Sequence, residues 1–233
     1  MSNKPRLVVL SGSGISAESG IPTFRDAKGL WEGHRWEEVA SPDGFERDPA
    51  LVLHFYNVRR AALKVVEPNA GHFALVKLEE KFDVHIITQN VDDLHERAGS
   101  KNVLHLHGEL RKVRSTVNRK LVLDWDGDLN PGNTGPDGAQ LRPHIVWFGE
   151  EVPLMPQAEK ICSKADLMIV VGTSLVVYPA NGLVYEAPDD VPLYVVDPHR
   201  PSIDGYRGNV EFIEQTAAIG LPRLAARLMA QFG

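Results

Sequence analysis

Short runs of β-branched and other aliphatic residues recur along the chain, with polar segments between them. The runs are nearly continuous rather than alternating, so each predicts a strand that is buried on both faces, as in a parallel sheet. Segments with helical spacing of apolar residues alternate with the runs, and this order predicts a doubly wound parallel sheet of the α/β class. The predicted strands cover residues 6–11, 84–88, 102–106, 166–171, 193–196 and 210–213.

Helices are predicted over three longer segments. Residues 50–66 carry apolar residues at spacings of four and three, which gives one apolar stripe on a helix. Asn69 is a typical N-cap residue, so the next helix is expected over 69–81. The third helix is expected near 221–231. The stripe on the first helix consists of Leu51, Phe55, Val58, Ala62 and Val65.

Two segments interrupt the alternation of strands and helices. Residues 26–48 are rich in Gly, Trp, Arg and Glu without a clear period, which predicts a long functional loop. Residues 111–143 contain several Asp-Gly and Pro-Gly turn signals and predict a small, strand-containing module. The sheet domain is therefore expected over 1–110 and 144–233, with 111–143 as an insertion.

Composition narrows the classes of protein that the chain can represent. Of its 233 residues, 43% are hydrophobic and 24% are charged, which is typical of a globular domain. The net charge of −6 argues against non-specific binding to nucleic acid. No apolar run is long enough to span a membrane. Cys162 is the single cysteine, which excludes an internal disulfide and favours the cytoplasm.

A glycine-containing turn follows the first predicted strand. The sequence Ser11-Gly-Ser-Gly-Ile-Ser16 leads from strand to helix, an arrangement that lets backbone N–H groups approach a phosphate. The next glycine is Gly20, so the spacing is not that of the common G-x-G-x-x-G dinucleotide motif. Taken alone, the turn is a weak signal for a nucleotide-binding loop, and a tight strand-to-helix connection is the alternative.

Four blocks of sequence, in the same order as in the family, resemble the sirtuins, whose sheet domain is Rossmann-like. They lie between residues 6 and 222, so the resemblance covers nearly the whole chain. The blocks are Gly12–Arg25 with Gly29-Leu30-Trp31, Thr88–His95 with Leu106-His107-Gly108, Leu141-Arg142-Pro143 with Val146–Glu150, and Val171–Leu175 with Tyr178-Pro179-Ala180.

The resemblance implies a reaction that consumes NAD. The acyl group of a modified lysine is transferred to the ADP-ribose part of NAD, and nicotinamide is released. Such a reaction needs a base for a ribose hydroxyl, and imidazole has a suitable pKa. The family motif assigns this role to His107, which we expect at the end of a strand, just before Gly108. A purely structural histidine is the alternative, and a metal pair formed by His105 and His107 lacks an evident third ligand.

The resemblance also implies which residues contact NAD. Amide and carboxylate groups such as those of Gln89, Asn90 and Asp92 suit ribose hydroxyls and a carboxamide. An amide-rich turn with Asp92 at a helix start remains an alternative. Phe24 and Arg25 would cover the nicotinamide site. The implied cofactor-binding residues are Gly12, Ser13, Gly14, Phe24, Arg25, Trp31, Gln89, Asn90, Val91, Asp92, Gly172, Thr173, Ser174, Asp197 and Ala217.

The inserted module departs from the family pattern. Most sirtuins hold a structural zinc there with two Cys-x-x-Cys pairs, whereas the matching positions here are Ser115, Asn118, Thr134 and Asp137. A closed zinc site needs four nitrogen or sulfur ligands, which this set does not provide. We therefore expect no metal, and a module held by turn hydrogen bonds and packing.

Another departure concerns the substrate. Tyr56 and Arg59 are spaced i, i+3, so they are neighbours on one helix face, and Arg60 is expected to be more exposed. An inward-facing guanidinium pairs well with a carboxylate. The pair resembles the sirtuin branch that removes succinyl or malonyl groups; a solvated Arg59 is the alternative. The expected substrate-binding residues are Tyr56, Arg59, Val146, Phe148 and Gly149.

The expected function is thus an NAD-dependent protein-lysine deacylase with deacetylase and desuccinylase or demalonylase activity. Its expected partners are acylated-lysine proteins or peptides, with no specific nucleic acid and no membrane. A non-catalytic NAD or ADP-ribose sensor would not need Asn90, Asp92 and His107, which are all present. A mono-ADP-ribosyltransferase is a further alternative, and the Tyr56/Arg59 pair argues against it.

Overall fold

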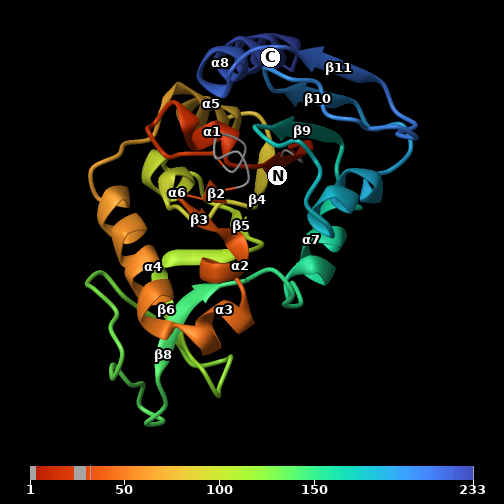
Figure 1. Cartoon of the computed structure of the whole chain (residues 1–233). Coiled ribbons are helices and arrows are strands. Elements are labelled where there is room, and N and C mark those ends of the chain that lie inside the picture. The colour runs from red at the N-terminus through yellow and green to blue at the C-terminus, as the bar shows by residue number, and fades with distance from the viewer. Residues whose placement is uncertain (1–3, 24–29, 32, 233) are drawn as a thin grey trace.

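The computed structural model describes residues 4–23, 30–31 and 33–232. Within this part of the chain, six parallel strands form one sheet in the order β11-β10-β9-β1-β4-β5 (Figure 1). All six were predicted, and the doubly wound α/β class is confirmed. The strands are β1 (Arg6–Ser11), β4 (Asp83–Thr88), β5 (Val103–His105), β9 (Leu167–Val171), β10 (Leu193–Val196) and β11 (Val210–Ile213).

The order of the strands reverses at β1. The chain continues from β1 to β4 on one side, and β9 pairs with β1 on the other. Ser11 is level with Thr88 in one neighbour and with Val171 in the other, so the three strands end together. In open parallel sheets, ligands bind at such a switch point, beyond the carboxyl ends of the strands.

Two apolar layers cover the sheet. Successive residues of β1 alternate between them: Leu7 and Val9 join one cluster, and Val8 and Leu10 join the other. The first layer contains α1 (Gly14–Ala17), α5 (Ala70–Leu78) and α8 (Ala217–Gln231), and the second contains α7 (Met155–Cys162) and the 3-10 helix Ala180–Glu186. The predicted cap is confirmed, because Asn69 accepts from Gly71 N–H. Helix α8 begins four residues earlier than expected.

A second, antiparallel sheet lies beside the parallel one, below it in Figure 1. Its described strands are β6 (Gly108–Ser115), β7 (Val122–Asp124) and β8 (Leu141–Ile145), in the order β7-β6-β8. These strands extend beyond 111–143 at both ends, and the proposed domain division stays a prediction. Helix α4 (Pro49–Leu63) packs against β6 and β8. A short helix, α6 (Leu94–Ala98), follows β4.

The segment 26–48 is not the loop that we expected. Its described part contains β2 (Leu30–Trp31), β3 (His34–Arg35), α2 (Trp36–Val39) and α3 (Pro42–Arg47). Helix α3 starts with a Ser-Pro pair, in which the Ser41 hydroxyl accepts from Gly44 N–H at 2.9 Å. Ser at an N-cap and Pro at the first helical position are standard start signals. Helices this short have no apolar period to detect, which is why the segment resembled a loop.

The buried face of α4 also differs from the expected stripe. Val58 and Val65 are 47% and 82% exposed, whereas Arg60 is only 2% exposed. The cause is the small sheet, which supplies carbonyl partners: Arg60 Nε donates to Leu110 O at 2.8 Å, and Nη1 donates to Gly127 O at 3.3 Å. Arg60, expected to be the more exposed arginine, is therefore a buried contact between α4 and the small sheet.

Hydrogen bonds hold the module positions that the resemblance to the sirtuins matches to zinc-binding cysteines. Ser115 Oγ donates to Asp137 Oδ2 at 2.6 Å and accepts from the N–H groups of Val117 and Asn118. Thr134 forms a backbone bridge with Gln140. Within the described residues, no group of three or more His, Cys, Asp or Glu side chains is placed to hold a metal ion. Nor does any helix of these residues have the length and apolarity needed to cross a bilayer.

Candidate active site

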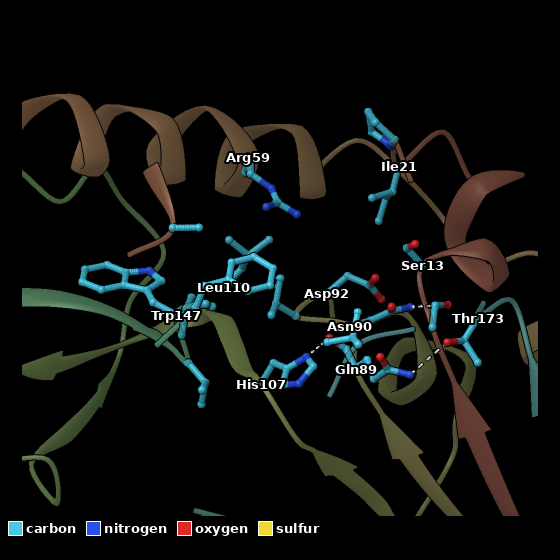
Figure 2. A pocket seen from close by; sticks show the side chains of 18 of the residues that line it. Ser13, Ile21, Arg59, Gln89, Asn90, Asp92, His107, Leu110, Trp147 and Thr173 are labelled. Atoms are coloured by element: carbon cyan, nitrogen blue, oxygen red, sulfur yellow. Dashed lines mark hydrogen bonds between the residues drawn. The ribbon is translucent and has the colours of Figure 1, made fainter. Parts of the chain in front are cut away.

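A cavity of about 320 Å³ lies between the carboxyl edge of the parallel sheet and the walls formed by α4 and the small sheet (Figure 2). Loops that follow β1, β4 and β9 line one end, which we call the nucleotide half. Helix α4 and the turn after β8 line the other, which we call the acyl half. Residues from five distant parts of the chain thus meet in one cavity.

The loops after β1 and β9 are in direct backbone contact. Gly12 N donates to Val171 O at 3.0 Å, and Gly14 N donates to Gly172 O at 2.9 Å. A Cβ atom on Gly14 would lie 2.6 Å from Gly172 Cα, so no other residue fits without moving one of the loops. These glycines are needed for the close approach, and Ser13 between them lines the cavity.

The segment after β4 is bound to both loops. Asn90 Nδ2 donates to Gly12 O at 3.1 Å, and Gln89 Nε2 donates to Thr173 Oγ1 at 3.1 Å; both bonds are visible in Figure 2. Asn90 N also donates to Thr88 Oγ1. The three strand-end loops are therefore cross-linked by hydrogen bonds, which fixes their side chains relative to one another.

Asp92 takes the helix-start position that the sequence offered as one alternative, and it also lines the cavity. Its Oδ1 accepts from Leu94 N at 3.1 Å, as expected for a residue at a helix start, and its Oδ2 accepts from Ser16 Oγ at 3.0 Å. The side chain also lines the cavity and is 5% exposed. Burial raises the pKa of Asp92, and the two hydrogen bonds oppose that rise.

His107 lies in the turn between β5 and β6, two residues beyond the end of β5, and not at the end of a strand as expected. Its Nδ1 is 3.1 Å from Gln89 O. A carbonyl oxygen can only accept, so Nδ1 carries the proton and Nε2 keeps its lone pair. Burial lowers the pKa of His107. The turn therefore presents a neutral imidazole at the cavity, as a general base requires.

His105 does not form a metal pair with His107. Its Nε2 is 2.8 Å from Glu96 Oε1, and its Nδ1 is 3.1 Å from Asn90 O. Both ring nitrogens thus face oxygen atoms of the protein, which leaves no lone pair for a cation. Helix α6 brings Glu96 beside β5 and so supplies one of these two oxygen atoms.

The acyl half contains the Tyr56/Arg59 pair. Figure 2 shows Arg59 extending from α4 into the cavity, with His107 on the opposite wall. Tyr56 is fully buried, and its hydroxyl accepts from Trp147 Nε1 at 2.9 Å. Burial raises the pKa of Tyr56 to about 12, although the charge of Arg59 opposes the rise. The phenol thus keeps its own proton, which it can donate to an acceptor.

A buried ion cluster holds the turn after β8. Glu150 accepts from Arg142 at 2.8 Å and from Arg114 at 2.9 Å, and it also accepts from Trp147 N at 2.8 Å. The Arg142 guanidinium lies 3.3 Å from the centre of the Trp147 ring. We had not assigned a role to this cluster from the sequence. The signal was present, since three of its members lie in the Leu141–Glu150 block.

Most of the residues expected at the site do line the cavity. Asp197, which follows β10, and Ala217, at the start of α8, lie outside its lining, as does Gly14. Phe24, Arg25 and the side chain of Trp31 lie outside the described residues. The expected residues in the lining are Gly12, Ser13, Tyr56, Arg59, Gln89, Asn90, Val91, Asp92, His107, Val146, Phe148, Gly149, Gly172, Thr173 and Ser174.

The sequence interpretation missed several apolar lining residues. Ile21, Leu63, Leu110 and Trp147 complete the wall of the acyl half and its junction with the nucleotide half. A motif does not reveal such residues, because an apolar residue that lines a cavity looks like any core residue. Ile21 and Trp147 do lie inside the sequence blocks that resemble the sirtuins, and Leu63 has helical spacing from Tyr56 and Arg59 on α4, but none of these signals marks a lining residue.

Comparison with known proteins identifies the family. Residues 12–179 match the model of the Sir2 family. An NAD-dependent protein deacylase of Helicobacter pylori (strain J99) is 53% identical over 223 residues, which cover 96% of this chain and 95% of the relative. One from Bacteroides thetaiotaomicron is 47% identical and covers 96% and 97%. The chain belongs to the Sir2 family, the sirtuins.

Solved structures agree with this assignment. A Sir2 homolog in complex with NAD superposes with a TM-score of 0.87 at 36% identity, covering 99% of this chain and 91% of that one. A Sir2 homologue in complex with ADP-ribose gives a TM-score of 0.88 at 37% identity, with coverage of 98% and 93%. The predicted family and its Rossmann-like fold are confirmed.

Proposed function

We propose that this sirtuin is an NAD-dependent protein-lysine deacylase that removes acidic acyl groups, succinyl and malonyl, in addition to acetyl. Deacylase activity follows from membership of the family and from relatives at 47–53% identity that carry this name. The preference for acidic groups rests on one observation, the position of the Arg59 guanidinium in the acyl half of the cavity.

The nucleotide half fits NAD. The polar groups of Ser13, Thr173 and Ser174, which line the cavity beside the glycines of the loops after β1 and β9, suit the pyrophosphate, because glycines allow the closest approach of a phosphate to the chain. Asn90 and Asp92 suit the ribose next to nicotinamide, since together they offer both donors and acceptors. When bound, NAD supplies the ADP-ribose that accepts the acyl group. The protein contributes fixed loops that hold this ribose beside His107.

His107 serves as the general base. With Nδ1 bound to Gln89 O, its Nε2 can accept the proton of a ribose hydroxyl. The proton acceptor is ready at neutral pH because burial lowers the pKa of the ring. His107, Asn90 and Asp92 together argue for an enzyme rather than a non-catalytic NAD or ADP-ribose sensor.

Arg59 and Tyr56 recognise the carboxylate of an acidic acyl group. Arg59 supplies a charged, forked donor inside a largely apolar wall, where a carboxylate is its natural partner. Tyr56 already accepts from Trp147, so its remaining bond is one that it donates. An acceptor-only carboxylate fits this pair, whereas the methyl end of an acetyl group does not use it. This specialisation for an acyl chain also argues against mono-ADP-ribosyl transfer.

Val146, Phe148 and Gly149 line the cavity along the turn after β8, where we place the substrate peptide. The partners are therefore proteins or peptides that carry acylated lysine, and we assign no nucleic acid or membrane partner. We place the protein in the cytoplasm, because one buried cysteine, Cys162, calls for no oxidising compartment.

The test is Arg59→Met, which retains the length of the side chain but leaves the substrate carboxylate unpaired. We expect kcat/KM for a succinyl-lysine peptide to fall, and the fall should correspond to a loss of about 2–5 kcal/mol of transition-state stabilisation. The value for the matched acetyl-lysine peptide should change little. Arg223→Met, on the exposed surface of α8, is the control and should change neither value. An unchanged ratio in Arg59→Met would leave a deacylase without acidic preference.

A further inference from the structure

His105 and His107 both bind the segment after β4, but their other ring nitrogens have different partners. Each directs Nδ1 at a backbone carbonyl: His107 at Gln89 O and His105 at Asn90 O, both at 3.1 Å. Their Nε2 atoms differ, because that of His105 is 2.8 Å from Glu96 Oε1. The two rings therefore bind neighbouring peptide groups of the loop that contacts NAD, and only one ring is also bound to a carboxylate.

The two hydrogen-bond partners of His105 require a positively charged imidazole ring. Its two partners, a carbonyl and a carboxylate oxygen, can only accept, so both ring nitrogens must donate. A neutral imidazole has a single N–H and would leave one contact without a proton. His105 is 8% exposed, so water does not readily replace either partner. His107 has one such contact and needs only the neutral form.

The bond from His105 affects the site because it binds the main chain of Asn90. Its main-chain carbonyl is bound to His105, and its side chain donates to Gly12 O at 3.1 Å and to Ser16 Oγ at 3.2 Å. Asn90 is thus bound to His105 through its main chain and to the segment after β1 through its side chain. Loss of the His105 bond would free the peptide that orients the Asn90 amide.

We propose that His105 is a positioning residue: as an imidazolium bound to Glu96, it fixes the Asn90 peptide and thereby the Asn90 side chain, and this role rests on the proposed contact of that side chain with the nicotinamide ribose. His105 itself does not line the cavity. The role is distinct from the proton transfer assigned to His107, and it holds for any acyl group that the enzyme removes.

Charged groups around His105 support the charged form. Burial lowers the pKa of His105, but the hydrogen bond and the charge of Glu96 outweigh this effect, and the pKa is raised. Glu109 on β6 acts in the same direction. The other titratable or charged groups that interact with His105 or Glu96 are Asp92, His95 and Lys112.

Two amide variants separate the two bonds. In His105→Asn, Nδ2 can take the place of imidazole Nδ1 and donate to Asn90 O; the Glu96 side chain, 41% exposed, can be solvated. In His105→Gln, Nε2 takes the place of imidazole Nε2, which keeps the Glu96 bond and abandons Asn90. Both variants remove the charge, and they differ in which contact survives.

The measurement is kcat and the KM for NAD with an acetyl-lysine peptide, together with the melting temperature. We expect His105→Gln to lose roughly 10- to 100-fold in kcat, the scale of a misplaced reacting group, while His105→Asn loses only severalfold. His85→Gln is the control, since His85 pairs with Asp83 at 3.0 Å near the opposite end of β4. Equal losses of kcat in the two variants, or no loss in either, would overturn the proposal.

The pH profile adds a readout that a structural role would not change. The proposal expects wild-type kcat/KM to fall on the alkaline side as His105 loses its second proton. Glu96→Gln, which removes the stabilising charge, should move this fall to lower pH, and His105→Asn should abolish it. An alkaline limb that is the same in all three proteins would show that the charge of His105 plays no part.

Discussion

The two halves of the cavity are built in different ways. The nucleotide half consists of loops at the carboxyl ends of β1, β4 and β9, which bind one another through hydrogen bonds such as Gly14 N to Gly172 O. The acyl half consists of a helix and a turn that belong to neither side of the parallel sheet. There, α4 meets the turn after β8 through side chains, as in the bond from Trp147 to Tyr56.

This difference indicates that the overall rate and the selectivity among acyl groups can vary independently. The loops of the nucleotide half are fixed by the sheet and by glycine contacts, so a change there displaces the reacting groups for every substrate. The acyl half has a wall whose side chains can be exchanged without moving a strand. Variants in the nucleotide half should therefore lower kcat/KM for all acyl peptides by the same factor. Variants in the acyl half should change the ratio of kcat/KM between acyl peptides.

The largest effect is expected for His107→Ala. Removing a general base costs about 10² to 10⁴ in rate, and we expect this loss in kcat/KM for succinyl-lysine and acetyl-lysine peptides alike. The ratio of the two values, measured with matched peptides, should stay within about twofold. A ratio that shifts together with the rate would mean that His107 also contacts the acyl chain, and the division into halves would fail at this residue.

The next effect concerns the stability of the acyl half. Glu150→Gln leaves the buried guanidinium groups of Arg142 and Arg114 without a counter-charge, and breaking such a pair costs about 3–5 kcal/mol. Urea unfolding should report this loss, with Arg207→Gln, which breaks an exposed pair with Asp189, as the control. A loss below about 1 kcal/mol would show that packing alone holds the turn.

The same ion cluster sets an acid limit on stability. Burial raises the pKa of Glu150, but Arg142 outweighs that effect, so the pKa in the folded protein is lowered. A lowered pKa contributes stability above the unfolded value of about 4.3, and this contribution is lost as pH falls through the folded value. The free energy of unfolding of the wild-type protein should therefore decrease as the pH falls below about 4.3, whereas that of Glu150→Gln should depend less on pH in this range.

The parallel sheet could be predicted from sequence because each strand carries its own signal. Residues 6–11, 193–196 and 210–213 were predicted with the bounds that the structure shows. Strands buried on both faces need continuous aliphatic runs, whatever their partners are. The residues of the nucleotide half follow those strands as contiguous motifs, and the resemblance of these motifs to the sirtuins, rather than the glycine spacing alone, assigned them to NAD.

The acyl half could be predicted only in part, because its partners are distant in sequence. The Tyr56/Arg59 pair was identified by its spacing, but Arg60 was expected to be exposed. The carbonyl groups that bind Arg60 belong to Leu110, on β6, and to Gly127, in the loop after β7, both more than 40 residues later in the chain. Nothing local marks an arginine that will meet such partners, nor a valine such as Val65 that will meet none.

A smaller effect is expected for Tyr56→Phe. The variant removes one hydroxyl donor to the substrate carboxylate, and a hydrogen bond to a charged group contributes about 1.5–3 kcal/mol. The fall in kcat/KM for the succinyl peptide should therefore be smaller than in Arg59→Met, with little change for acetyl. Tyr206→Phe is the matched control, because the Tyr206 hydroxyl donates to Val191 O and neither residue lines the cavity. Equal losses for both peptides would place Tyr56 in the support of Trp147 alone.

The smallest effect is expected in the acid limb of the wild-type pH profile. A general base works only when it is neutral, so activity is lost as pH falls through the pKa of His107. Burial lowers that pKa below its ordinary value of 6.5. At pH 6.5 more than about half of the free enzyme should then hold a neutral His107, and kcat/KM, which reports on the free enzyme, should retain more than about half of its plateau value. Both acyl peptides should give the same limb, because the base belongs to the nucleotide half. A midpoint above pH 6.5 would contradict the neutral, buried imidazole, and different midpoints for the two peptides would show that the halves are coupled.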